Sequence, residues 1–259
     1  MHWVLNNIPT WAIGFVIVCG ATLLTLGALH IVRRRNLVSD EDSVSLGGTL
    51  EVVGAIYGIV LAFVIVLMWQ SIDTARDAVS DEASSLAQFA IDIRVLPPED
   101  RARVENSLSN YLNAVLDEEW DAMADGHESL RAHRALDRIF TTMEHVRPVT
   151  DVQQTWYVEA VSKLNESTTY RRKRLETMNN LLPLPVDILL FGGAIITLAF
   201  VVIHGSRRSG THTFVVAALA ALIAYNLFLA LILDYPFSGS ISVTPEPFRQ
   251  GVLLQFEGP

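Results

Sequence analysis

Four apolar segments, each long enough to cross a lipid bilayer, constrain this chain more than any other feature. They cover residues 11–32, 50–70, 186–203 and 213–233. A helix needs about 17–25 mostly apolar residues to span about 30 Å of hydrocarbon, and it satisfies its own backbone hydrogen bonds there. We therefore predict an all-α, multi-pass membrane protein with four transmembrane helices, whose partner is the lipid bilayer.

The first apolar segment is interpreted as a retained span and not as a signal peptide. No lysine or arginine precedes it, and its basic run, at 33–35, follows it. A signal peptide has the opposite order, with positive charge before the apolar stretch.

The charge balance and the cysteine count exclude several partners. A formal net charge of -9 at pH 7 argues against nucleic acid, because phosphate binding needs concentrated positive charge. Cys19 is the only cysteine, so disulfides within the chain and cysteine-based metal clusters are excluded. We predict no cofactor and no metal. Proton sensing or metal binding by His30, His204 and His212 is kept as a minor alternative.

The polar middle, residues 71–182, is predicted to form an extramembrane helical bundle. Neither Pro nor Gly separates it from the second span, so that span should continue outward as one long helix. Three further helices are expected at about 98–125, 128–145 and 151–180, joined by short turns. Apolar residues at helical spacing should form the inner faces of the first three of these four helices: Ala75, Val79, Leu86, Phe89, Ile93 and Leu96, then Val104, Leu108, Tyr111, Leu112, Val115 and Trp120, then Leu130, Leu136, Ile139, Phe140 and Met143.

The basic residues beside the spans leave open which side of the membrane the bundle faces. The runs at 33–35 and 207–208 favour short cytoplasmic loops and a bundle outside the cell. The run at 171–174, on the bundle side of the third span, counts against this placement.

A ladder of small residues runs along one face of the second span, at Gly54, Gly58 and Ala62. Small residues at every fourth position allow helices to approach closely in lipid. Packing within the chain explains this pattern, and so does packing between subunits around a central axis. Both interpretations stay open on the sequence alone.

A second face of the same helix repeats a large apolar residue every four positions, at Ile59, Phe63 and Leu67. In an oligomer these residues would form stacked apolar rings, a constriction that gates by dewetting. In a monomer they would face lipid. Glu51 and Tyr57 are predicted to lie at a pore mouth or to hold neighbouring helices.

Other polar and aromatic residues are given structural roles. Asp187 and Asp234 lie at the ends of spans, and Tyr235 and Phe237 suit interfacial aromatic anchors in the tail, residues 234–259. The acids around Glu118–Trp120 are expected to form a solvated helix face. We predict that the chain is not an enzyme, because it has no G-x-S-x-G, H-E-x-x-H or Walker-type motif.

Several short motifs together point to a known family. They are Glu51-x-x-Gly54-x-x-Tyr57-Gly58 with LAF and WQ in the second span, EEW after Tyr111, RRKRL, LP before the third span, DYPFSG and PEPF. This combination resembles the bacterial membrane family known as DUF4239 or bestrophin-like, over nearly the whole chain.

The resemblance implies distant kinship to bestrophins, which are pentameric anion channels with four membrane helices per subunit and a cytosolic helical region. Their second membrane helix lines a narrow apolar neck, and residues 50–70 have the matching place in the chain order. The resemblance therefore implies a homo-oligomer, a pentamer by analogy, in the bacterial inner membrane. No acidic cluster matches the calcium clasp of many bestrophins.

We predict an oligomeric ion channel, with chloride favoured among inorganic ions and residues 50–70 lining the pore. A ring of Glu51 in the pore would favour cations instead, so this acid weakens the anion prediction. The alternative is a non-conducting sensor or scaffold whose helical bundle binds a partner. A proton- or sodium-driven stator-like unit ranks last, because no span carries a carboxylate at mid-depth.

Overall fold

The computed structural model describes residues 2–35, 40–178, 182–204 and 210–256, with side chains for all of these except 40–47. The described residues form helices and turns, and no strand occurs among them. This confirms the all-α prediction. The chain divides into two compact units.

The first unit, called here the membrane unit, comprises Asn7–Gln70 and Leu181–Asp234. It contains α2, the first part of α3, α8 and α9. These helices are Thr10–Arg35, Asp40–Asp92, Leu184–His204 and Gly210–Leu233. All four are long and apolar enough to cross a membrane.

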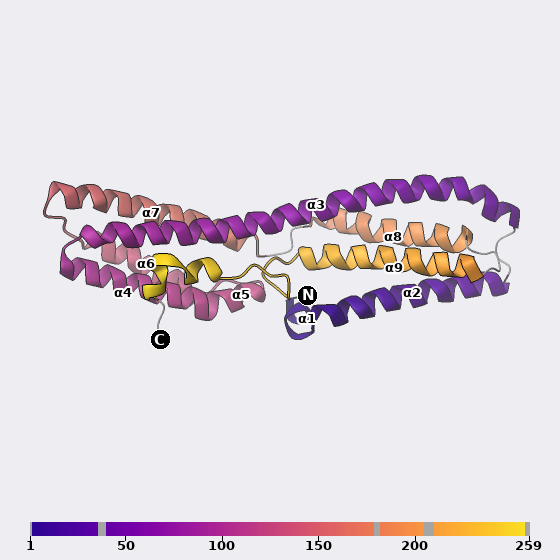
Figure 1. The fold of residues 1–259 in the computed structure, drawn as a ribbon, viewed down its shortest axis with the longest axis horizontal. Helices are drawn as coiled ribbons and strands as arrows, with labels where there is room; N and C mark the ends of the chain where they lie inside the picture. The colour runs from indigo at the N-terminus through magenta and orange to yellow at the C-terminus, as the bar shows by residue number, and fades with distance from the viewer. Residues whose placement is uncertain (1, 36–39, 179–181, 205–209, 257–259) are drawn as a thin grey trace. The chain divides into compact units, whose positions relative to one another are not determined.

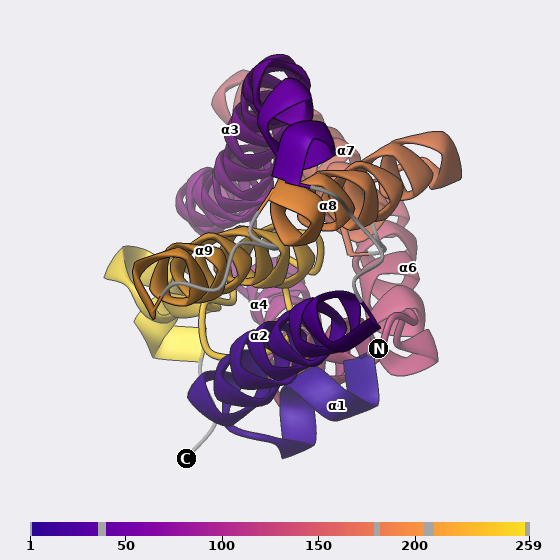
Figure 2. The same ribbon diagram turned by 90° about the vertical axis from the view of Figure 1, so that its right-hand side faces the viewer.

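Close approach of helices holds the membrane unit together. The main packing partner of α2 is α9, which lies beside it (Figure 2). A Cβ added at Gly14 of α2 would lie 2.5 Å from the ring of Phe228 on α9, so only glycine allows this approach. Leu29, Val201 and Val216 bring α2, α8 and α9 into one buried cluster.

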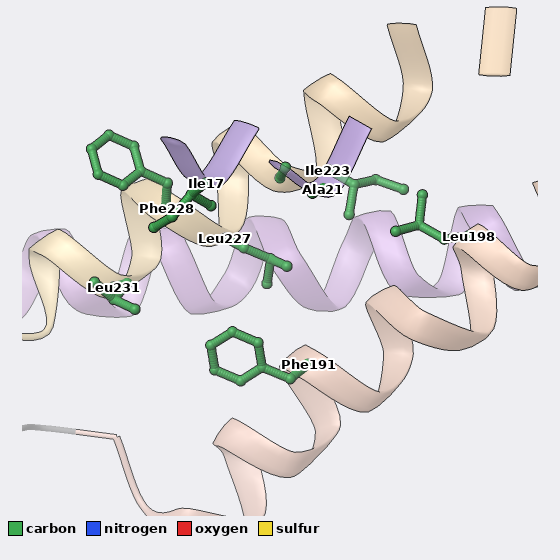
Figure 3. Close-up of a pocket in the computed structure, with 9 residues that line it drawn as sticks. Ile17, Ala21, Phe191, Leu198, Ile223, Leu227, Phe228 and Leu231 are labelled. Carbon is green, nitrogen blue, oxygen red and sulfur yellow. The ribbon is translucent and has the colours of Figure 1, made fainter. Parts of the chain in front are cut away.

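A small pocket of about 100 Å³ remains between α2, α8 and α9 (Figure 3). Its lining is apolar throughout and consists of Ile17, Ala21, Phe191, Leu198, Ile223, Ala224, Leu227, Phe228 and Leu231. An ion needs water or polar ligands along its path. This pocket offers neither, so it is not a route for ions through a single subunit.

The second unit, called the bundle unit, comprises Met1–Asn6, Ser71–Asn180 and Tyr235–Pro259. Its elements follow the chain order in Figure 1. They are α1 (His2–Asn7), the second part of α3, η1 (Ile93–Val95), α4 (Pro98–Ala114), η2 (Val115–Glu119), α5 (Trp120–Ala124), α6 (Leu130–Glu144), α7 (Asp151–Glu176), η3 (Glu246–Arg249) and η4 (Gly251–Phe256).

The long helix predicted from the second span is present, because α3 runs without a break from Asp40 to Asp92. The apolar residues predicted on its inner face, from Ala75 to Leu96, are all buried. Pro98 then starts α4 with two acids in its first turn, where a fixed φ and negative charge suit a helix N-terminus.

The helix predicted at about 98–125 is not continuous. A π-helical turn, η2, separates α4 from α5. Such a turn adds one residue to the helix and changes which side chains face inward after it. Sequence periodicity alone does not reveal it.

Capping side chains fix the ends of the next helices. Ser129 accepts hydrogen bonds from the backbone N–H groups of Arg131 and Ala132 at the start of α6. Thr150 and Gln153 form a capping box at the start of α7. Leu130 was expected to point inward but is 68% exposed, because it occupies the first position after the cap.

Both chain ends contribute to the bundle unit. His2 contacts the carbonyl oxygen of Ala124 and the hydroxyl of Ser238, each at 2.9 Å from its Nδ1. The expectation that Phe237 anchors the chain at the membrane interface is wrong. Its ring is buried in edge contact with Trp120, inside this unit.

Candidate functional site

A groove of about 670 Å³ runs along α3 within the membrane unit, where α8 and α9 complete its walls. Most of its lining is apolar, and the polar members are Glu51, Tyr57, Thr197 and Asn226. The complete lining is Leu50, Glu51, Gly54, Tyr57, Gly58, Leu61, Ala62, Ile65, Val66, Thr197, Val201, Leu219, Leu222, Ile223 and Asn226.

The small-residue ladder faces this groove and not a neighbouring helix of the same chain. A Cβ added at Gly54 or Gly58 would meet no atom within 4 Å in the described part of the chain. Ala62 is exposed and lines the same groove. Packing within the chain therefore does not account for the two glycines.

Tyr57 has a different role from its glycine neighbours. Its side chain is buried, and its hydroxyl donates a hydrogen bond of 3.1 Å to the carbonyl oxygen of Leu190 on α8. A Cβ added at Gly193 of α8 would lie 2.6 Å from the Tyr57 ring. Of the two roles predicted for Tyr57, the structure places it in helix packing between α3 and α8.

The three predicted constriction residues lie on the surface of the single chain. Ile59, Phe63 and Leu67 are 59%, 66% and 54% exposed. A helix face that lines a pore and one that meets lipid both need this exposure. Glu51 is also exposed, and it lies at the Leu50 end of the groove, one turn before Gly54.

The histidines near the short loops show no metal site in the described residues. The rings of His204 and His212 meet edge to face with centroids 6.5 Å apart. No group of three or more His, Cys, Asp or Glu side chains there is placed to hold a metal ion.

The bundle unit contains a cluster of buried charges that the sequence reasoning missed. Arg174 on α7 donates from Nε to Glu82 Oε2 of α3 at 2.7 Å and from Nη2 to Glu119 Oε2 of η2 at 3.2 Å. Arg171 pairs with Glu119, and Tyr111 donates its hydroxyl to Glu82 Oε1 at 2.6 Å. The two glutamates balance the two arginines.

The prediction of a solvated acidic face at Glu118–Trp120 is wrong for Glu119. The π-helical turn points Glu119 inward, where its side chain has no exposed surface, while Glu118 stays exposed. Arg174 is equally buried, and its guanidinium carbon lies 5.2 Å from the ring centroid of Trp120. The run at 171–174 thus contains two arginines that are neutralised inside the protein.

Burial and charge act in opposite directions on the groups of this cluster. Burial lowers the pKa of Arg174, but Glu82 and Glu119 raise it, so the pKa lies above its ordinary value and the guanidinium stays charged. Burial, with Glu82 and Glu119, raises the pKa of the Tyr111 hydroxyl well above its ordinary value. The cluster is fully paired, which makes it a structural feature and not a ligand site.

The sequence pattern of the bestrophin-like domain matches residues 15–248 of the chain. The chain belongs to the bestrophin-like family. The match extends over both units, so the membrane helices and the bundle are parts of one family domain. None of the curated proteins matches the chain.

Solved structures share the fold of this bestrophin-like protein. One variant of a bacterial bestrophin homologue from Klebsiella pneumoniae has a TM-score of 0.70 and 14% identity, covering 92% of this chain and 97% of that one. A second variant has a TM-score of 0.68, 16% identity and coverage of 92% and 98%. A crystal structure named only as a membrane protein has a TM-score of 0.65 and 17% identity, with coverage of 93% and 100%. At such identities the likeness establishes the fold.

Proposed function

We propose that this bestrophin-like protein is a subunit of a homo-oligomeric ion channel in the bacterial inner membrane, with α3 lining the pore. The observation that carries the proposal is the open groove along α3, whose glycines face no part of their own chain. A helix of a neighbouring subunit fits such a face, because small residues let backbones approach closely in lipid. Five subunits are proposed by analogy with bestrophins.

Ile59, Phe63 and Leu67 form the constriction in this proposal. They repeat every four residues, so one helix from each subunit supplies a stack of three apolar rings. Their exposure on the single chain supports this role, since a pore-lining side chain has no partner in its own subunit.

Chloride is the proposed ion, and Glu51 is the group that decides the selectivity. A ring of carboxylates at a pore mouth attracts cations. Chloride conduction therefore requires that Glu51 lie outside the ion path, at the helix contact along the groove.

Ion flux from liposomes containing the purified protein tests the proposal, with chloride and sodium gradients applied separately. We expect chloride flux, and we expect Phe63→Ala to increase it by widening the constriction. Phe214→Ala is the matched control, because Phe214 on α9 is 73% exposed and should face lipid. Equal effects of the two variants would contradict a constriction at Phe63.

Glu51→Gln separates the two selectivities. If chloride is conducted and Glu51 lies outside the path, the permeability ratio of chloride to sodium stays unchanged. If sodium flux dominates and falls in this variant, the channel is cation-selective and Glu51 lies at its mouth. No flux of either ion in folded, inserted protein would favour the non-conducting sensor or scaffold.

A further inference from the structure

The bundle unit has a second groove, of about 460 Å³, between α4, η2 and α6. Three arginines of α6 line it, Arg131, Arg134 and Arg138, together with Asn110 of α4. All three arginines are exposed. This local positive charge contrasts with the net charge of -9 for the whole chain.

The three arginines lie on one face of α6. Their spacing of three and then four residues places neighbours about 5–6 Å apart at Cβ, and the row extends about 10 Å along the helix. A guanidinium presents a planar fork of donors that matches phosphate oxygens two at a time. The row can therefore contact an anion longer than a single phosphate.

The arginines of the groove differ from other cations of the bundle unit in having no acidic partner. Within the described part of the chain, no carboxylate oxygen lies within 4.0 Å of Arg131, Arg134 or Arg138. By contrast, Arg101 pairs with Glu105 at 2.7 Å on α4. Like charges three and four residues apart destabilise a helix, and a bound anion would relieve this repulsion.

One carboxylate, that of Glu118, also lines the groove. The hydroxyl of Ser129 donates a hydrogen bond of 2.5 Å to Glu118 Oε1, which holds this acid at the start of α6. The ionised side chains of the lining therefore carry more positive than negative charge, because three arginines face one glutamate.

We propose that this groove binds a small molecule that carries a diphosphate group. Two linked phosphates reach more than one arginine of the row, and the Asn110 amide adds a donor beside them. The volume lies within the range of about 300–1,000 Å³ that is usual for small-molecule sites. Leu130, which is 68% exposed at the edge, gives apolar surface to the remainder of the ligand.

Titration calorimetry on the full-length protein in detergent, at fixed ionic strength, tests this site independently of ion conduction. The probes are inorganic diphosphate, inorganic phosphate and a hexaglutamate peptide. We expect diphosphate to bind at least tenfold more tightly than the other two. Absence of diphosphate binding at millimolar concentration, or equal binding of the three probes, would overturn the proposal.

Three single substitutions locate the site. Arg134→Gln should raise the Kd for diphosphate about tenfold or more, and Glu118→Gln should lower it, because the repelling charge is removed while a hydrogen-bond acceptor for Ser129 remains. Arg172→Gln, at an exposed arginine of α7 outside the groove, should leave the Kd unchanged. Equal weakening by Arg134→Gln and Arg172→Gln would show that binding follows net charge and would overturn the site.

Discussion

In the bundle unit, the charged residues of the core find partners within their own chain, whereas in the membrane unit the small residues of α3 face none. Glu82, Glu119 and Arg174 have no exposed surface, and each is paired with an opposite charge. Gly54 and Gly58 instead border a groove of about 670 Å³. The comparison teaches that a single chain completes the core of one unit and leaves a face of the other open.

The solvent around each unit explains part of this difference. Buried charges are costly unless each is paired and hydrogen-bonded, so a charged core must be complete before it is stable. Apolar and small residues on a membrane helix carry no such cost, because lipid covers them as well as protein does. An open face is therefore tolerated in the membrane unit, where a second subunit can later occupy it.

The largest predicted effect comes from breaking the buried charge cluster. Arg174→Ala should destabilise the protein by about 3–5 kcal/mol, because it leaves Glu82 and Glu119 without their shared partner. The apparent Tm in detergent, followed by helical circular dichroism, measures this effect. Arg172→Ala on the same helix is exposed and should stay within about 0.5 kcal/mol of the natural protein. Similar losses in the two variants would show that the cluster adds no special stability.

Two glycines that appear equivalent in the sequence should respond differently to alanine. At Gly193 the added Cβ lies 2.6 Å from the Tyr57 ring, and such overpacking costs about 1–3 kcal/mol. At Gly58 the added Cβ meets nothing within its own chain, so the apparent Tm of the monomer should not fall.

The open face at Gly58 should instead be sensitive in assembly. We expect Gly58→Leu to lower the oligomeric fraction measured by size-exclusion chromatography with light scattering, because the larger side chain separates neighbouring helices. Gly20→Leu on α2 is the control, because a Cβ there also meets no atom within 4 Å and Gly20 does not line the groove along α3. An unchanged oligomer in the Gly58 variant would mean that this face meets lipid.

A smaller effect, dependent on pH, is expected at Tyr111. Tyr111→Phe removes the hydrogen bond to Glu82 and should cost about 1–2 kcal/mol at neutral pH. The pKa of Tyr111 is raised in the folded protein, so its contribution to stability is present below the unfolded pKa of 10.0 and is lost as pH rises above it. The natural protein should therefore lose more stability above pH 10 than the phenylalanine variant. Parallel loss in both would contradict the buried, neutral tyrosine.

Much of the fold follows from patterns that depend on one helix at a time. The apolar lengths predict four spans, and the stripe from Ala75 to Leu96 predicts the inner face of α3. The buried arginines were missed because the run at 171–174 was interpreted only as basic charge beside a membrane. A signal for them was present, since Leu164, Arg171 and Arg174 continue one inner face of α7 at helical spacing.

Other features depend on contacts that one helix does not encode. Glu119 faces inward because of the π-helical turn, and its partners are 52 and 55 residues away in the chain. Phe237 is buried because Trp120, far from it in sequence, is its neighbour. The role of Ile59, Phe63 and Leu67 depends on other subunits, so it stays a prediction even with the structure of one chain.

Labelling at position 63 tests most directly whether this face of α3 meets water or lipid. The background variant Cys19→Ala removes the only cysteine, and Phe63→Cys or Phe214→Cys then adds one. We predict that a charged, membrane-impermeant thiol reagent blocks ion flux through the Phe63→Cys channel and leaves flux through the Phe214→Cys control unchanged. A thiol at position 63 that does not react in a conducting channel would contradict a pore lined by α3.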